Sequence, residues 1–348
     1  AVQTVCQQPF AFIWGPPGTG KTTTLGATVA TFLEQGLRIL VTAHSNRALD
    51  VAAESVHDRT RDLGLCDGDL FRVGYAVNMR GEVFKALGAE RVLARHRDTS
   101  RYVAQMEDAR ERLRGLMADL NEAKAQSKRR QLLDVIQETT TIVAALRHKL
   151  RELEAERSRH ARVLFCTLSK YAITQAIYDQ TFDVVIVDEA SMAVVPAIML
   201  VTNAAQRGAA IYGDFRQLPP VVLADTKMAR KWLSTDIYTA SRIKAAAERD
   251  EEDPRLAMLE EQYRMHPEIA EFCSELAYSG RLITPPSTEQ TTSRLRAHPP
   301  APGVSLIGWH TRHLGFRARR DNLAGSRFNI ESGLLSFSLA RRLLESGA

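Results

Sequence analysis

Residues 15–22, with the sequence GPPGTGKT, combine glycines, a lysine and a threonine at a spacing that fits phosphate binding. The glycines let successive backbone N–H groups curve around phosphate oxygens. Lys21 is placed to reach the β- and γ-phosphates of ATP, and the Thr22 hydroxyl is a suitable ligand for Mg²⁺. A chance glycine turn is the alternative, but an apolar strand before the run and a helix after it favour a phosphate site. The residues expected to bind the nucleotide here are Gly15, Pro16, Pro17, Gly18, Thr19, Gly20, Lys21, Thr22 and Thr23.

Two adjacent carboxylates end the apolar part of TFDVVIVDEASM, residues 181–192. Such a run predicts a strand buried on both faces, as in a parallel sheet. We expect this strand to lie next to the strand that precedes the glycine-rich run. Asp188 would then hold Mg²⁺ through a water molecule, and Glu189 would orient and deprotonate the water that attacks the γ-phosphate. A helix N-cap pair is the alternative, and it would account for only one of the two acids.

Gln217 is a further candidate, in the run GDFRQLPP at residues 213–220. Its neutral amide can hydrogen-bond both the γ-phosphate and the attacking water, so we predict that it senses which nucleotide is present. The tripeptide RQL alone would mean little. Its position directly after an apolar segment gives it weight.

Five short apolar segments predict strands at residues 10–14, 38–43, 163–168, 182–188 and 209–214. Helical stretches begin near Lys21, Asn46, Lys170 and Ala193. Strands that alternate with helices indicate an α/β fold with a parallel, doubly wound sheet. Ligands of such sheets bind beyond the carboxyl ends of the strands, which is where Asp188 and Glu189 stand.

The segment from about residue 98 to 160 interrupts this alternation. It is rich in Arg, Glu, Ala and Leu and contains no proline. Its apolar residues recur at steps of three and four, which predicts an antiparallel helical hairpin with its tip at 123–131. The charged surface is explained either by a solvated structural arm or by an arm that contacts the substrate. The predicted seam consists of Val103, Met106, Leu113, Leu116 and Leu120 on one arm and Leu132, Ile136, Val143, Leu146, Leu150 and Leu153 on the other.

The sequence pattern changes after Pro254, which we interpret as a domain boundary. We expect a first domain at 1–255, with the hairpin as an insertion, and the incomplete beginning of a second domain at 256–348. The chain opens on Ala1 within what reads as the end of a helix, so we expect it to be part of a longer protein.

The composition is that of a soluble globular protein, with 348 residues, 45% hydrophobic and 25% charged. A net charge of +5 permits a polyanionic partner. No apolar run approaches the ~20 residues that cross a bilayer, so we expect no membrane partner. The four cysteines form no CxxC pair, which indicates buried thiols in a reducing, cytoplasmic compartment and not metal ligands or disulfides. The histidines show no spacing typical of a metal site.

Five motifs occur together in one order: GPPGTGKT, AHSNRALD, VDEAS, GDFRQLPP and EQYRMHPEI. Their order and spacing resemble those of superfamily 1 helicases, in the 5′→3′ branch that contains senataxin-like and nonsense-mediated-decay helicases. The resemblance covers residues 1–280 and is weaker beyond them. It implies a RecA-like P-loop NTPase fold with a partial second RecA-like lobe, ATP between the lobes and a single strand of nucleic acid lying across both.

The resemblance also implies roles for single residues. Tyr263 would stack on adenine, and Arg264 would reach the γ-phosphate from the second lobe; from the residues alone, a core aromatic and a surface ion-pair partner are the alternatives. Ser45 and Asn46 open a helix after a strand, so they can bind a strand phosphate, and simple N-capping is compatible with that role. Thr167 matches a family position that contacts the nucleic-acid backbone.

The chain departs from the family pattern in several places. The adenine-reading glutamine and a small β-barrel would fall upstream of Ala1, and Glu331 stands one residue early in SRFNIESG. The later motifs, with a second arginine, would fall after Ala348.

We predict an ATP-dependent helicase or translocase that acts on single-stranded DNA or RNA. Its cofactors are ATP and Mg²⁺, and its catalytic residues are Lys21, Glu189, Gln217 and Arg264. The alternative is an ATP-controlled conformational switch whose hairpin binds a protein partner without unwinding. Residues 1–348 alone are expected to hydrolyse ATP weakly or not at all, because the second lobe is incomplete.

Overall fold

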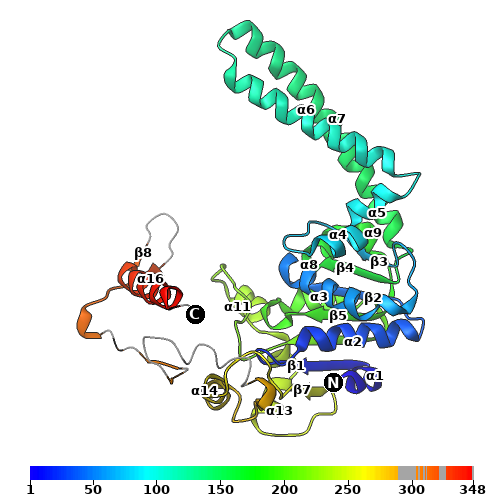
Figure 1. The fold of residues 1–348 in the computed structure, drawn as a ribbon. Helices are drawn as coiled ribbons and strands as arrows, with labels where there is room; N and C mark the ends of the chain where they lie inside the picture. Colours follow the sequence, from blue (N-terminus) through cyan, green and yellow to red (C-terminus); the bar gives the residue numbers. More distant parts are fainter. Residues whose placement is uncertain (289–302, 305, 309, 311, 321–326, 347–348) are drawn as a thin grey trace. The chain divides into compact units, whose positions relative to one another are not determined.

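The chain forms two compact units in the computed structural model, which describes residues 1–288, 303–304, 306–308, 310, 312–320 and 327–346 (Figure 1). Unit 1 comprises residues 1–14 and 21–258. Unit 2 comprises residues 15–20 and 259–348. The glycine-rich run is therefore divided: its loop belongs to unit 2, and Lys21 opens a helix of unit 1.

Unit 1 is built on a seven-stranded sheet in the order β3-β4-β2-β5-β6-β1-β7. Every neighbouring pair in this sheet is parallel. The α/β fold of the RecA-like, P-loop class predicted from the sequence is thereby confirmed. The strands are β1 (Phe10–Trp14), β2 (Ile39–Ala43), β3 (Leu70–Arg72), β4 (Val163–Thr167), β5 (Phe182–Asp188), β6 (Ala205–Gly213) and β7 (Leu256–Met258).

The five strands predicted from apolar runs are confirmed, with ends shifted by a few residues. The two edge strands β3 and β7 were not predicted, and β7 lies beyond the boundary expected at residue 255. The prediction that β5 lies next to β1 is wrong, because β6 pairs with both of them and separates them. The long strand β6 follows β5 in the chain after a single α-helix. Consecutive strands are usually neighbours in a sheet, so β6 lies beside β5 and separates it from β1.

The helices of unit 1 form two sets that follow from the strand order. Connections β1-α2-β2 and β2-α3-β3 run toward the β3 edge, whereas β4 to β5 and β5 to β6 run toward β1. Right-handed crossovers in opposite directions place helices on opposite faces of a sheet. Contacts agree, since α2 packs on α3 and α8 packs on α10. The helices flanking the sheet are α1 (Val2–Gln7), α2 (Lys21–Glu34), α3 (Asn46–Arg59), α4 (Gly81–Leu87), α5 (Ala89–Arg95), α8 (Leu168–Ile173), α9 (Gln175–Tyr178), α10 (Val195–Thr202), α11 (Lys227–Leu233), α12 (Ile237–Ala240) and α13 (Ile243–Glu248), with 3₁₀ turns η1 (Arg61–Leu63) and η2 (Ala190–Met192).

The predicted helical hairpin is confirmed as α6 (Ser100–Glu122) and α7 (Gln126–Ser158), which extend side by side away from the sheet (Figure 1). Met106 and Val143 are buried between the arms, and Leu146 and Leu150 pack against them. Toward the tip the seam residues are only half-buried. The tip is shorter than predicted, because α7 begins at residue 126. No helix in the described ranges is long and apolar enough to cross a membrane.

Unit 2 contains α14 (Pro267–Ala277), the 3₁₀ turn η4 (Arg312–Leu314), the antiparallel pair β8 (Arg319–Arg320) and β9 (Arg327–Phe328), and α16 (Ile330–Glu345). Before α14, Gln262 N donates to Ile283 O at 2.9 Å and Ile283 N donates to Glu260 O at 2.9 Å. These bonds tie residues 260–262 to the segment that follows α14. Asn329 caps α16, since its Oδ1 accepts from Ser332 N at 2.9 Å.

Candidate functional site

Lys21 meets the two predicted acids at the carboxyl edge of the sheet in unit 1. It is the first residue of α2, directly after the loop that follows β1. Its Nζ lies 2.7 Å from Glu189 Oε1 and 3.7 Å from Asp188 Oδ1. The lysine and both acids therefore come together as predicted, although β6 separates their strands.

A turn of the backbone brings both neighbouring carboxylates to the same ammonium. Asp188 is the last residue of β5 and is 3% exposed, which is rare for a carboxylate without a cation. Glu189 leaves the strand in the left-handed region, with φ 50°, which is uncommon for a residue with a side chain. Its N–H donates back to Asp188 Oδ1 at 2.9 Å. Backbone strain of this kind is concentrated at functional sites.

Burial and charge act in opposite directions on the pKa values in this cluster. Burial lowers the pKa of Lys21, but the nearby carboxylates of Asp188 and Glu189 outweigh it, so its pKa is raised and the ammonium stays charged. Burial raises the pKa of Asp188, and the charge of Lys21 opposes that change only in part. The cluster therefore places one cation beside two acids. A cation can bind a phosphate group, and carboxylates can bind a metal ion.

Gln217 is held by a buried aspartate at the end of β6. Its Nε2 donates to Asp214 Oδ2 at 2.7 Å, while Trp14 Nε1 donates to Asp214 Oδ1 at 2.9 Å. The carboxylate can only accept, so the NH₂ end of the Gln217 amide faces it. The carbonyl oxygen of Gln217 is then the end that can accept a hydrogen bond from a water molecule.

The loop of unit 2 has the backbone that a phosphate cradle requires. Gly18 and Gly20 have φ values of 80° and 77°, which glycine adopts without steric cost. Thr19 Oγ1 donates to Pro16 O at 2.8 Å and closes the turn. Tyr263 N donates to Gly18 O at 2.9 Å, and a Cβ added to Gly18 would stand 2.6 Å from Arg264 Cβ. The loop and residues 262–264 are thus packed directly together within unit 2.

Tyr263 and Arg264 do not behave as ordinary structural residues. Tyr263 is 56% exposed, so the alternative of a core aromatic is wrong. Arg264 is exposed, as a surface residue would be, and has no ion-pair partner in the described part of the chain. The buried side chain of Gln262 orders this turn, because its Oε1 accepts from Arg264 N at 3.0 Å and Met265 N at 2.7 Å.

The predicted strand contacts lie on neighbouring strands of unit 1. Thr167, at the end of β4, pairs in register with Ala43 at the end of β2. Ser45 caps α3 by accepting from Ala48 N at 3.2 Å, and Thr167 caps α8 by accepting from Lys170 N at 3.2 Å. N-capping is therefore real at both positions. The N-termini of α3 and α8 lie at the same edge of the sheet, and a capped helix N-terminus can still bind a phosphate there.

Two family profiles, both described as an AAA domain, match residues 1–225 and 239–348. The first covers more than half of the chain. The chain belongs to this AAA-domain family of superfamily 1 helicases, in the senataxin-like branch. The resemblance inferred from the motifs is confirmed.

Relatives of this helicase-family chain are similar over most of its length. It is 30% identical to the DNA-binding protein SMUBP-2 of Mesocricetus auratus over 290 residues, which is 81% of this chain and 27% of the relative. It is 30% identical to the ATP-dependent helicase upf1 of Schizosaccharomyces pombe over 84% of this chain and 28% of the relative. The ATP-dependent helicase NAM7 of Saccharomyces cerevisiae is 30% identical over 89% of this chain and 28% of the relative. The chain thus spans roughly a quarter of the length of these relatives.

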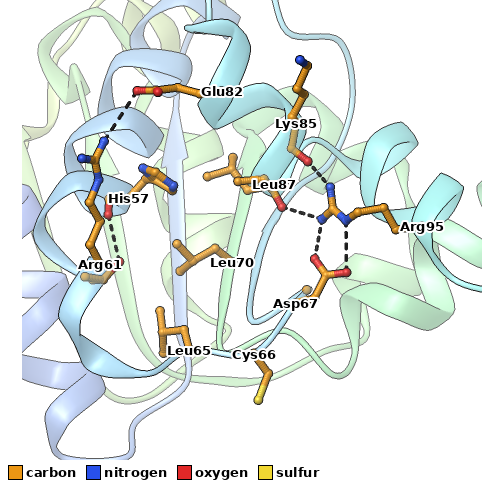
Figure 2. Close-up of a pocket in the computed structure, with 13 residues that line it drawn as sticks. His57, Arg61, Leu65, Cys66, Asp67, Leu70, Glu82, Lys85, Leu87 and Arg95 are labelled. Carbon is orange, nitrogen blue, oxygen red and sulfur yellow. Dashed lines mark hydrogen bonds and ion pairs between the residues drawn. The ribbon is translucent and has the colours of Figure 1, made fainter.

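None of these motif residues lines a hollow of about 550 Å³ that lies in unit 1 of the helicase-family chain, between the end of α3, β3, α4 and α5 (Figure 2). Both arginines in its wall are engaged within it: Arg95 binds Asp67 and two backbone carbonyls, and Arg61 lies 3.6 Å from Glu82. Lys85 has no ion pair among the described residues, and one such ammonium does not make a phosphate site.

Sequence reasoning missed several residues that build the site. Asp214 and Gln262 stand inside the quoted motifs but were not singled out, and the only signal was their place beside Gln217 and Tyr263. Asp50 likewise ends the quoted motif AHSNRALD but was not singled out. Arg72 was missed entirely, because it lies within the run LFRVG, where a single arginine gives no sign of burial.

Proposed function

We propose that this chain carries the ATPase machinery of a helicase or translocase acting on single-stranded nucleic acid. The observation that carries the proposal is the Lys21 ammonium held between Asp188 and Glu189 at the end of β5. The family supports it, since two of the relatives are named ATP-dependent helicases and a third a DNA-binding protein.

The residues present suit ATP with Mg²⁺. The buried carboxylate of Asp188 needs a cation, and the positive φ values of Gly18 and Gly20 give the loop the curved backbone that a phosphate cradle uses. The loop and Lys21 would bind the phosphates, while Thr22 and, through water, Asp188 would hold Mg²⁺. Bound Mg²⁺ would neutralise negative charge on the β- and γ-phosphates.

The protein's own groups account for activation of water. Glu189 accepts the proton of the attacking water, and the carbonyl oxygen of Gln217 accepts a hydrogen bond that orients the same water. Arg264 stabilises negative charge that develops on the γ-phosphate, and Tyr263 stacks on the adenine, as the family resemblance implies. Two RecA-like lobes would close around the nucleotide and so couple hydrolysis to movement of the strand.

Ser45, Asn46 and Thr167 are the proposed contacts to phosphates of the strand. Backbone contacts of this kind carry no base specificity, so DNA and RNA strands are both candidates. The hairpin tip carries a basic cluster that could add a contact to the strand or to a protein partner. The free cysteines suit a reducing compartment inside the cell.

The general-base assignment is tested by Glu189→Gln. In the full-length protein, we expect this variant to keep nucleotide binding and to lose ~10²–10⁴-fold in turnover, because the amide cannot take a proton. Lys21→Ala should instead weaken nucleotide binding itself. Glu34→Gln, at an exposed carboxylate at the end of α2, is the matched control for the change of charge. Turnover at the wild-type rate in Glu189→Gln would reject the assignment.

A further inference from the structure

A buried ion pair stands behind the proposed strand site. Arg72 of β3 and Asp50 of α3 have side chains that are each 1% exposed, and Arg72 Nη2 lies 3.1 Å from Asp50 Oδ1. Burying two charges is costly unless hydrogen bonds satisfy nearly every donor and acceptor. The hydrogen-bond partners of Arg72 and Asp50 are the groups that this ion pair positions.

The first partner is the side chain of Asn46. Arg72 Nη2 donates to Asn46 Oδ1 at 2.9 Å. A guanidinium has only donors, so the amide of Asn46 must present its oxygen to Arg72. The two N–H donors of the amide then lie on the side away from Arg72. Asn46 is oriented as a donor, which is the polarity that an anionic phosphate requires.

The second partner is the loop at residues 73–78. The same Arg72 nitrogen donates to Tyr75 O at 3.0 Å, and Asp50 Oδ2 accepts from Val77 N at 2.7 Å and Asn78 N at 3.2 Å. One guanidinium nitrogen thus touches both Asn46 and the backbone of Tyr75. The loop is fixed beside the start of α3 by groups that are themselves buried.

The loop also connects to the hairpin and to the second strand contact. Gly74 N donates to Glu154 Oε1 of α7 at 3.2 Å, and Lys170 Nζ lies 3.4 Å from Glu154 Oε2. Lys170 is the residue whose N–H is capped by Thr167. Both proposed phosphate contacts, on α3 and on α8, are therefore joined through this loop.

Tyr75 projects from the fixed loop. It is 77% exposed and has no aromatic or cation–π contact among the described residues. A cavity of about 370 Å³ lies beside it, and the charged residues in its wall are Glu90, Glu154, Arg110, Arg147 and Arg151. Arg110 Nη1 lies 3.4 Å from Glu90, so Arg147 and Arg151 are the arginines of this wall that have no ion pair among the described residues. An exposed ring on a backbone held by Arg72, with two such arginines beside it, suits a planar base attached to a phosphate.

We propose that Asn46 and Tyr75 form one nucleotide subsite, built on the buried Arg72–Asp50 pair. The inference rests on the proposed strand-binding function. The Asn46 amide donates to a phosphate of the strand, and the Tyr75 ring stacks on a base of the same strand. Arg72 acts as a positioning residue, because it orients the amide and holds the ring's backbone in the same place. Stacking tolerates any base, so the subsite grips the strand without reading its sequence.

The stacking part is tested with two strands of equal length, one of oligothymidine and one fully abasic. Tyr75→Ala should weaken binding to oligothymidine by about fivefold to a hundredfold and leave binding to the abasic strand unchanged. Tyr75→Phe retains the ring and should recover most of the lost affinity. Val77→Ala, in the same loop and 57% exposed, is the matched control for disturbance of the loop.

Fluorescence polarisation with labelled strands separates the outcomes. An equal loss on both strands, or no loss on either, would overturn the stacking role of Tyr75. If the wild-type protein binds neither strand, the proposed function is rejected, and the subsite with it.

The orientation of Asn46 is tested by comparing Asn46→Asp with Asn46→Ala. Aspartate keeps an acceptor for Arg72 but places negative charge where the amide donors were. We expect Asn46→Asp to bind strands more weakly than Asn46→Ala, although its melting temperature should be at least as high. A merely structural role would rank affinity and stability in the same order. If the variant with the lower melting temperature also binds strands more weakly, the positioning role of Arg72 is overturned. Nucleotide affinity, measured on both variants, serves as the control for folding of the ATP site.

Discussion

Lys21 serves the fold as well as the proposed chemistry, because its charge opposes the rise that burial causes in the pKa of Asp188. The two roles can be separated by their dependence on pH. Lys21→Ala removes the charge that chiefly opposes burial and leaves only the hydrogen bond from Glu189 N, so the pKa of Asp188 rises further above its usual range. A carboxyl with a raised pKa in the folded state stabilises the fold below its unfolded-state pKa, and this contribution is lost as pH rises through the folded-state pKa.

We therefore expect Lys21→Ala to be less stable than the wild type at pH 8, by up to about 3 kcal/mol, and to recover part of that loss at pH 5.5. Urea unfolding at the two pH values measures the difference. The double variant Lys21→Ala/Asp188→Asn removes the titrating group and should show no such recovery. If Lys21→Ala and the double variant respond alike to pH, Asp188 is not the group responsible.

Gly18 is a second residue whose role the structure makes specific. A side chain here meets two penalties within unit 2: φ is 80°, and the new Cβ would stand 2.6 Å from Arg264 Cβ. Gly280 has φ 74° and nothing within 4 Å of the corresponding position, so it carries only the first penalty.

We expect Gly280→Ala to cost roughly 1 kcal/mol of unfolding free energy and Gly18→Ala to cost a further ~1–3 kcal/mol from the collision. Gly18→Ala should also weaken nucleotide binding, since the cradle must shift. Denaturant unfolding and nucleotide titration of both variants provide the comparison. Equal losses of unfolding free energy in the two variants would show that the loop relaxes and that the contact with Arg264 Cβ costs nothing.

Among the elements, β4 provides a chemical probe of the sheet. Burial raises the pKa of Cys166 to about 12, as expected of a buried thiol. Cys6 and Cys66 are exposed, so the prediction of buried thiols is wrong for these two. The thiolate is the reactive form, so iodoacetamide at pH 8 should modify the two exposed thiols and spare Cys166 until the protein unfolds. Mass spectrometry of tryptic peptides identifies the sites. Modification of Cys166 as fast as Cys66 in the native protein would place β4 outside the core.

Long apolar runs were sufficient to predict β1, β2, β4, β5 and β6, because a strand buried on both faces has no polar positions. The edge strands β3 and β7 were not predicted, because they are short and are not buried along their whole length. β3 has three residues and contains Arg72, and β7 has three residues that are each half-buried. Such strands are defined by their pairing with β4 and β1, which is a contact between distant segments and leaves no local pattern.

The candidate site divides in the same way. Lys21, Asp188 and Glu189 were predicted because each belongs to a motif with a chemical reason for its spacing. The order of strands that brings them together was predicted wrongly, since no local pattern states that β6 lies between β1 and β5. Asp50 stood in the quoted motif AHSNRALD without an assigned role, and Arg72 gave no signal, because a buried arginine and an exposed one look the same in a sequence.

The tip of the hairpin is an element whose charges can be tested without breaking the arm. Arg129 Nη1 donates to Leu120 O at 3.0 Å and so closes the end of α6. Lys124, Lys128 and Arg130 carry no such bond in the described structure. We expect the triple alanine variant of these three to keep its helix content and to bind strands with a weaker dependence on salt, by up to ~2 in the slope of log K against log salt. An unchanged slope would mark the hairpin as a structural arm.

At the scale of the whole molecule, charge and stacking make separable contributions to strand binding. The net charge of +5 and the proposed phosphate contacts predict an affinity that falls steeply with salt and ignores base sequence. Stacking on Tyr75 releases no counterions, so its contribution should persist at any salt concentration.

Plots of log K against log salt for the wild type and Tyr75→Ala should therefore be parallel lines displaced by a constant factor, about fivefold to a hundredfold. The variant that lacks the three tip cations should instead give a line of different slope that meets the wild-type line at high salt. Titrations of one oligothymidine strand between about 50 mM and 500 mM salt decide between these forms. Lines for Tyr75→Ala that converge with the wild type would mean that this residue acts through charge, and the stacked base would have to be abandoned while the phosphate contacts stood.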